Sequence, residues 1–155
     1  IADFNRYRSE APQKLEQVAD RSILKIYPFD KDNPLDFSWL VKSVLNELQK
    51  GVPRSEIASA FHRTYAAMWC VELAKQAVRQ KLSRVVLCGG VFQNKLLVDI
   101  LMPMLRQLGL QPYLPASVPC NDAGIAVGQM AVTAAWIEQS MNHNDKRHAR
   151  VVVGL

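Results

Sequence analysis

Several features that define common protein classes are missing from this 155-residue sequence. It has no apolar run of the roughly 20 residues that cross a bilayer, and residues 1–6 mix apolar and charged side chains, unlike a signal peptide. The three cysteines form no C-x-x-C pair, which argues against a disulfide framework or a cysteine zinc site. We therefore expect a cytoplasmic protein with reduced thiols and no membrane association.

Signals for nucleic-acid binding are also missing. The net charge is +5, but the basic residues are spread along the chain, without an arginine-rich block or an aromatic RNA-binding motif. Neither G-x-G-x-x-G nor the P-loop pattern occurs. We expect no nucleic-acid partner. Because the sequence begins at Ile1, we interpret it as a fragment of a longer protein or as a chain that lacks a processed segment.

The most informative stretch is residues 85–94, which read V-V-L-C-G-G-V-F-Q-N. Its apolar start predicts a short strand buried on both faces. Gly89 and Gly90 permit a tight turn and leave room for a ligand beside the main chain. A helical period follows over residues 94–108. Backbone N–H groups at such a turn favour phosphate, although a Gly-Gly pair also serves as a plain β-to-α turn.

The rest of the chain reads as mostly helical. Apolar periodicity predicts further helices over residues 10–19, 37–49, 55–81 and 125–139. Asp36 and Ser55 are candidate caps, and residues 22–29 alternate loosely enough to form a strand. A second strand over residues 111–114 contains Pro112, which suits an edge position. On the helix over residues 37–49, we expect a buried side formed by Trp39, Leu40, Val44, Leu45 and Leu48.

Strand, helix and strand in this order predict a parallel pair, residues 84–87 and 111–114, with a right-handed crossover. Consecutive parallel strands place their C-terminal loops at one edge, so Gly89–Gly90 and Asn121–Asp122 should face one crevice. Asp122 could cap the helix that follows it or hold a metal or a phosphate-bound cation. His62 has no histidine four residues later, so we do not expect it to bind a metal.

Several separated motifs resemble those of the hydrogenase maturation carbamoyltransferases, the HypF family. Residues 88–97, C-G-G-V-F-Q-N-K-L-L, are similar to the family's S-G-G-V-F-Q-N-R-L-L. Residues 119–129 resemble its P-x-N-D-G-G-L-A-L-G-Q, and residues 57–66 its helix I-A-x-x-F-H-x-x-L-A. Residues 11–16, A-P-Q-K-L-E, look like its A-A-M-x-L-E element, and the whole resemblance runs from about residue 9 to residue 139.

The resemblance implies an α/β fold: the mostly helical C-terminal lobe of an actin-like ATPase (ribonuclease-H-like) fold with a small parallel sheet. This lobe, residues 1–139, would belong to a module related to the universal tRNA threonylcarbamoyl transferase, and residues 140–155 would be a polar C-terminal tail. In this family, ATP and carbamoyl phosphate give carbamoyl adenylate. The carbamoyl group then passes to the C-terminal cysteine of a hydrogenase maturation partner protein and becomes the cyanide ligand of nickel–iron hydrogenase.

By match to these motifs, the resemblance implies that Gly89, Gly90, Val91 and Asn94 bind the nucleotide. It implies that Asp122 is one ligand of a divalent metal such as zinc, iron or magnesium, and it assigns no catalytic residue. The family's H-x-x-x-H metal pair and the segments that form carbamoyl adenylate are absent from the sequence. We therefore expect the chain to require the missing N-terminal lobe and domains of the same protein and to be inactive alone.

The sequence also departs from the family pattern. Cys88 stands in place of a serine, which weakens any hydroxyl contact to phosphate, and Ala123 replaces a glycine. Arg8–Ser9 stand where the family has Glu-Gly, so adenosine contacts from that segment are not expected to be the same. Two alternatives stay open: a non-catalytic nucleotide-binding or scaffold lobe, and another transferase or kinase with an actin-like fold.

Overall fold

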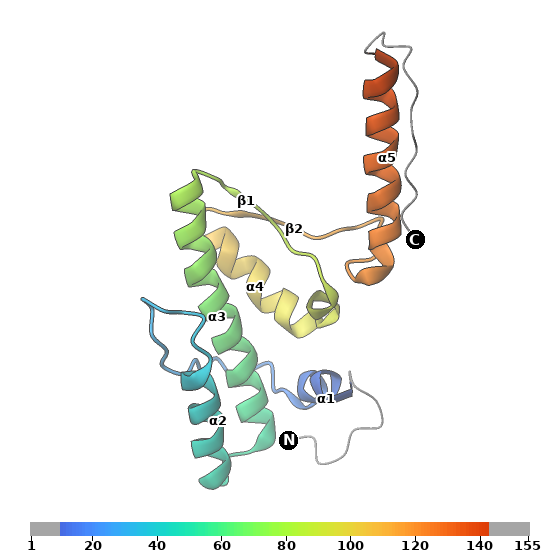
Figure 1. Ribbon diagram of the computed structural model, residues 1–155. Coiled ribbons are helices and arrows are strands. Elements are labelled where there is room, and N and C mark those ends of the chain that lie inside the picture. Colours follow the sequence, from blue (N-terminus) through green and yellow to red (C-terminus); the bar gives the residue numbers. More distant parts are fainter. Residues whose placement is uncertain (1–9, 143–155) are drawn as a thin grey trace.

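The computed structural model describes residues 10–142, with side chains described to residue 139. Figure 1 shows the arrangement of the elements. In chain order they are α1 (Glu10–Val18), α2 (Ser38–Gln49), α3 (Arg54–Gln80), β1 (Arg84–Val86), the 3-10 helix η1 (Gly90–Gln93), α4 (Lys95–Gln107), β2 (Gln111–Tyr113), the 3-10 helix η2 (Asp122–Gly124) and α5 (Ile125–Asn142). The five predicted α-helices are confirmed to within about three residues at each end. No helix among the described residues is long and apolar enough to cross a membrane.

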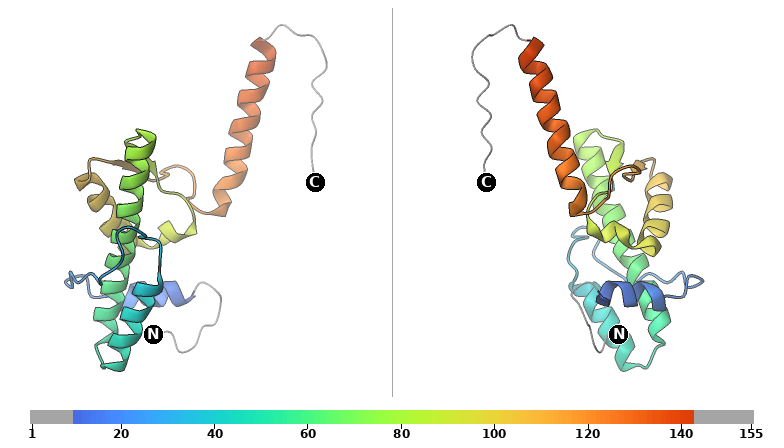
Figure 2. Two further views of the ribbon diagram at one scale, coloured as in Figure 1. Left: turned by 60° about the vertical axis from the view of Figure 1, so that its left-hand side comes forward. Right: turned by 90° about the vertical axis from the view of Figure 1, so that its right-hand side faces the viewer.

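Helix α3 is the central element, and α1, α2 and α4 all pack against it (Figures 1 and 2). Fully buried alanines on α3, among them Ala58, Ala60 and Ala66, let the neighbouring helices approach closely. Ser55 does not cap this helix as predicted, because α3 begins one residue earlier and Pro53 occupies the N-cap position. Its C-cap residue, Lys81, adopts a left-handed conformation.

Two clusters of buried hydrophobic residues pack against α3, and Tyr65 of this helix contacts both. The larger cluster lies between α3, α4 and the strands and includes Leu87, Leu97 and Leu105. The smaller one joins α2 and the extended chain before it to α3 through Leu40, Met68 and Tyr27.

The two strands form the predicted parallel pair, with Val85 opposite Pro112 and Val86 opposite Tyr113. The prediction that β1 is buried on both faces is wrong for the described chain. Leu87 is buried, but Val86 is 66% exposed and Cys88 is also exposed. The sheet packs toward α3 and α4 with one face, and no described segment covers the other.

The strand predicted over residues 22–29 is not formed. The Tyr27 N–H donates to Thr64 Oγ1 at 2.8 Å, and Arg63 Nε donates to the Ile23 carbonyl at 2.6 Å. The backbone of this segment therefore bonds to side chains of α3 in place of a neighbouring strand.

Helix α2 buries less of its apolar side than predicted. Leu40 is 2% exposed and Val44 is half-buried, but Trp39 is 47% exposed and Leu45 is 53% exposed. Leu48, at 37%, is exposed as well. Asp36 accepts a hydrogen bond from the Ser38 N–H at 3.0 Å, but it is not the N-cap that was predicted, because Phe37 occupies that position. The narrow contact of α2 with α3 decides which of these apolar residues is buried.

Helix α5 stands apart from the body of the molecule (Figures 1 and 2) and contacts it chiefly through η2. Its apolar residues are exposed: Ile125, Val127, Met130, Val132, Trp136 and Ile137. Residues 143–155, most of the predicted polar tail with Val151–Val153, lie outside the described part of the chain, as do Arg8 and Ser9.

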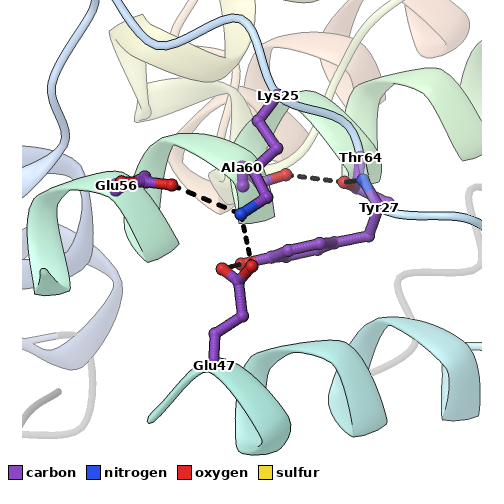
Figure 3. A network of polar contacts seen from close by, with 6 residues as sticks. All are labelled: Lys25, Tyr27, Glu47, Glu56, Ala60 and Thr64. Atoms are coloured by element: carbon purple, nitrogen blue, oxygen red, sulfur yellow. Dashed lines mark hydrogen bonds and ion pairs between the residues drawn. The ribbon is translucent and has the colours of Figure 1, made fainter. Parts of the chain in front are cut away.

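A polar network ties the extended segment before α2 to α2 and α3 (Figure 3). Lys25 forms ion pairs with Glu47 of α2 and, at 3.3 Å, with Glu56 of α3. The Tyr27 hydroxyl donates to Glu47 at 2.7 Å. Burial pushes the pKa of Glu47 upward, but the hydrogen bonds from Lys25 and Tyr27 outweigh it and hold that pKa below 4.5.

Replacing Glu47 with glutamine should lower the free energy of unfolding at pH 7 by about 1 kcal/mol, since a charge-assisted acceptor is lost. A lowered carboxyl pKa stabilises the fold above the unfolded pKa, and this contribution disappears as the pH falls through the folded pKa. The wild type and Glu47→Gln should therefore converge in acid. Urea unfolding from pH 7 down to pH 3 checks this, with Glu138→Gln on exposed α5 as the control. A constant difference across that range would contradict it.

Candidate functional site

The loops that follow the two strands are joined directly. The Leu87 N–H donates to the Tyr113 carbonyl at 2.8 Å, which continues the parallel ladder past β1 and β2. Two residues further along the first loop, the Gly89 N–H donates to the Cys120 carbonyl. The glycine turn and the segment before Asn121 and Asp122 therefore lie side by side, as predicted from the parallel strands.

The glycine turn is open on its outer side. Gly89 has φ 112° and ψ 158°, a conformation that is essentially restricted to glycine. Gly90 begins η1, and a Cβ atom on it would meet no atom within 4 Å. Within residues 10–142, the structure records no hydrogen-bond acceptor for the N–H groups of Gly90 and Val91. Two backbone donors therefore remain available at the end of the sheet.

Asn94 lies at the junction of this turn with α4. Its Oδ1 accepts a hydrogen bond from the Leu97 N–H at 2.8 Å and so caps α4. Because the amide oxygen faces the helix, Nδ2 faces His62 and lies 2.9 Å from its Nε2. The side chain predicted to contact nucleotide therefore also makes two contacts within the protein.

A second side chain caps the same helix end. Glu16 of α1 accepts a hydrogen bond from the Leu96 N–H at 3.1 Å through Oε1. The sequence interpretation gave no role to Glu16 and only argued against a metal role for His62. The available signal was that both residues lie in motifs that resemble the same family, and the structure brings these motifs together at the start of α4.

The geometry determines the tautomer of His62. The side chain is 3% exposed, and Nδ1 lies 2.7 Å from the Ala58 carbonyl oxygen, which can only accept. Nδ1 therefore carries the proton, and Nε2 accepts from Asn94. Burial lowers the pKa of His62 below 6.5, against the opposing effects of the Ala58 bond and the Glu16 carboxylate.

Asp122 is not the cap of the turn that it begins. That role belongs to Asn121, whose Oδ1 accepts from the Ala123 N–H at 3.2 Å. The Asp122 side chain is exposed. Among the described residues no group of three or more His, Cys, Asp or Glu side chains could hold a metal ion. Asp122 could thus supply one carboxylate ligand, and the described chain does not complete a site around it.

The surroundings of the turn are apolar. A groove of about 290 Å³ runs between α3 and the segment from Val85 to Phe92, lined by Tyr65, Trp69 and Leu73 on the α3 side. Of the cysteines, Cys88 is exposed at the turn and Cys120 is half-buried beside it. Cys70 lies in the core, where burial raises the pKa of its thiol to about 11 and leaves it unreactive at neutral pH.

The mostly helical lobe, its parallel strand pair and the two loops at one sheet edge fit the C-terminal lobe of an actin-like transferase fold. Residues 1–129 match the family model described as carbamoyltransferase, Kae1-like domain, second subdomain. The chain belongs to this HypF carbamoyltransferase family.

Individual relatives agree with this assignment. The chain is 38% identical over 128 residues to carbamoyltransferase HypF of Rhizobium leguminosarum bv. viciae, a match that covers 81% of this chain and 16% of that protein. It is 33% identical over 124 residues to a tRNA N6-adenosine threonylcarbamoyltransferase of Legionella pneumophila (strain Corby), covering 73% of this chain and 37% of that protein.

A crystal structure of full-length HypF in the phosphate- and nucleotide-bound form superimposes with a TM-score of 0.78 at 26% identity. The match covers 86% of this chain and 22% of that one. This neighbour confirms the predicted fold class, the mostly helical lobe of an actin-like fold. The chain therefore spans less than a quarter of the solved protein.

The two glycines of the turn should respond differently to substitution. Gly89→Ala should lower the free energy of unfolding by about 1–3 kcal/mol, because its backbone angles strain any other residue. Gly90→Ala should change it by less than about 0.5 kcal/mol, because its Cβ meets open space. Urea denaturation of both variants tests this, and equal losses would show that the turn geometry is not as described.

Proposed function

We propose that this chain is the C-terminal lobe of a cytoplasmic carbamoyltransferase that acts in nickel–iron hydrogenase maturation. The enzyme would use ATP and carbamoyl phosphate, via carbamoyl adenylate, to carbamoylate the C-terminal cysteine of a partner protein. The observation that carries this proposal is the hydrogen bond from Gly89 to the Cys120 carbonyl. It holds the glycine turn and Asp122, the two elements proposed to meet the nucleotide and the metal, at one edge of the sheet.

The turn suits nucleotide phosphates for a physical reason. The N–H groups of Gly90 and Val91 are donors without an acceptor in residues 10–142, and open space lies over Gly90. Adjacent backbone donors of this kind favour phosphate oxygens. In this proposal Gly89 sets the turn, Gly90 and Val91 bind the phosphates, and Asn94 holds the turn on α4. The missing hydroxyl at Cys88 leaves the backbone as the main source of donors.

A divalent metal fits this chain only in part. Asp122 is an exposed carboxylate beside the turn, and hard divalent cations favour carboxylate oxygens. Since the described residues form no group of three ligands, the other ligands would come from the remainder of the full-length enzyme. We therefore assign Asp122 a binding role and derive no chemical step from the metal.

Transfer to tRNA is the second candidate. It is favoured by the similarity to the tRNA N6-adenosine threonylcarbamoyltransferase of Legionella pneumophila. The two candidates differ in the acceptor, a protein thiol or a tRNA adenosine, and in the transferred group. A non-catalytic nucleotide-binding lobe would bind ATP and transfer to neither acceptor.

The chain alone should show no carbamoyl transfer, because half of a catalytic site cannot position the reacting groups.

A chimera tests the proposal: residues 1–129 replace the matching segment of the Rhizobium leguminosarum protein. With ATP and carbamoyl phosphate, it should carbamoylate a peptide with a C-terminal cysteine, detected by mass spectrometry. Gly90→Val in this chimera should weaken ATP binding about tenfold or more, and Gly90→Ala less. Transfer to tRNA alone would favour the second candidate, and ATP binding without transfer the non-catalytic lobe.

Alanine substitutions at Asp122 and Asn121 provide a matched comparison. Asp122→Ala in the chimera should reduce metal content and carbamoyl transfer and leave the melting temperature nearly unchanged, because Asp122 is not the cap. Asn121→Ala should lose about 1 kcal/mol of stability with the cap and retain the metal. Metal analysis and thermal melting separate the two effects. If Asp122→Ala retains full metal content, the metal assignment is wrong.

A further inference from the structure

Three segments far apart in the sequence meet at the first turn of α4. Glu16 accepts from the Leu96 N–H, and Asn94 accepts from the Leu97 N–H. His62, from the middle of α3, accepts in turn from Asn94. Two first-turn donors of α4, at Leu96 and Leu97, are thus satisfied by side chains that also link α1 and α3 to the glycine turn.

Each hydrogen in this chain of contacts has one consistent position. The Ala58 carbonyl requires the proton on Nδ1 of His62, which leaves Nε2 as an acceptor. The Leu97 N–H requires the amide oxygen of Asn94, which leaves its NH₂ as the donor to Nε2. If the Asn94 amide were flipped, its NH₂ would face the Leu97 N–H, donor against donor. Its oxygen would face Nε2 of His62, acceptor against acceptor. The neutral imidazole therefore selects the amide orientation that caps α4.

We propose that His62 is a positioning residue for the glycine turn: its unprotonated Nε2 holds the Asn94 amide in the orientation that fixes the turn on α4. Asn94 follows η1 directly, and its own N–H donates to the Val91 carbonyl at 3.1 Å. A rotation of Asn94 would therefore disturb the residues that present the N–H groups of Gly90 and Val91. The functional consequence, tighter nucleotide binding, rests on the proposed function.

Protonation of His62 would reverse this arrangement. Nε2–H would then face the Asn94 NH₂, donor against donor, and Asn94 would have to leave either His62 or Leu97. In the described chain, Glu16 of α1 is the charged group that acts on the ring, and it favours protonation. The contacts from α3 and the start of α4 are uncharged: Ala58, Asn94 and the Phe61 ring, which lies edge-on with its centroid 5.8 Å away.

Two variants distinguish the roles of the two ring nitrogens of His62. In His62→Gln, the side-chain oxygen can reach the place of Nε2 and accept from Asn94, but the donor to Ala58 is lost. In His62→Asn, the shorter amide can still donate to Ala58, but nothing replaces Nε2. We expect His62→Asn to speed amide hydrogen exchange at Asn94 and Leu97 about tenfold or more, and His62→Gln to change it little.

The exchange is measured by NMR on the 155-residue chain, together with the tautomer of His62 from its ring nitrogen shifts. Exchange at Ala66 in the core of α3 reports general destabilisation. The proposal is overturned if the neutral ring carries its proton on Nε2. It is also overturned if His62→Asn and His62→Gln affect Asn94 and Leu97 equally, or if both act only in step with Ala66.

A second experiment tests whether the His62–Asn94 contact affects nucleotide affinity. In the chimera, ATP affinity should fall several-fold in His62→Asn and much less in His62→Gln, and in the wild type it should weaken as His62 becomes protonated. If the wild-type chimera does not bind ATP, the proposed function fails, and the exchange experiment still decides the role of His62. If ATP binds equally in both variants despite the difference in exchange, His62 orders the turn without tuning the nucleotide site, and the functional part of the proposal is overturned.

Discussion

The attachment of α4 to α3 through Asn94 and His62 is the contact on which the candidate site depends. Leucines between these helices provide the burial that holds them together, but burial has no direction and does not orient the loop before α4. Orientation comes from polar atoms with few possible partners. Asn94 has one donor to satisfy at Leu97 and one acceptor at His62, so it can take only one position.

The other half of the site is held by the backbone itself. The parallel ladder extends past β1 through the bond from Leu87 to Tyr113, and a separate bond from Gly89 to the Cys120 carbonyl then joins the two loops. Main-chain hydrogen bonds of this kind do not depend on side chains, which explains how the site geometry can persist with Cys88 and Ala123 in place of the family's residues. Gly89, with its positive φ, lies at this junction of the two loops.

Most of the fold could be predicted from sequence because the relevant signals are local. The helices followed from apolar periodicity, and the parallel pair followed from the order of strand, helix and strand. Most of the predictions that were wrong concerned interactions with distant residues. Residues 22–29 alternate like a strand, but their backbone bonds to Arg63 and Thr64 of α3. The Ser55 prediction was a local error of position, because α3 begins one residue earlier and Pro53 is its N-cap.

The sequence by itself determined the helices, the glycine turn, the proximity of this turn to Asp122 and the family of the chain, because each of these depends on residue types at short spacing or in a fixed order. The tertiary structure decided which side chains serve the site. Glu16 and His62 carry no local signal for capping or positioning, and they act only because packing brings α1 and α3 to the N-terminus of α4. It also decided that Asn121 caps and that Asp122 stays exposed, since the direction of a side chain at a turn depends on how the chain enters it.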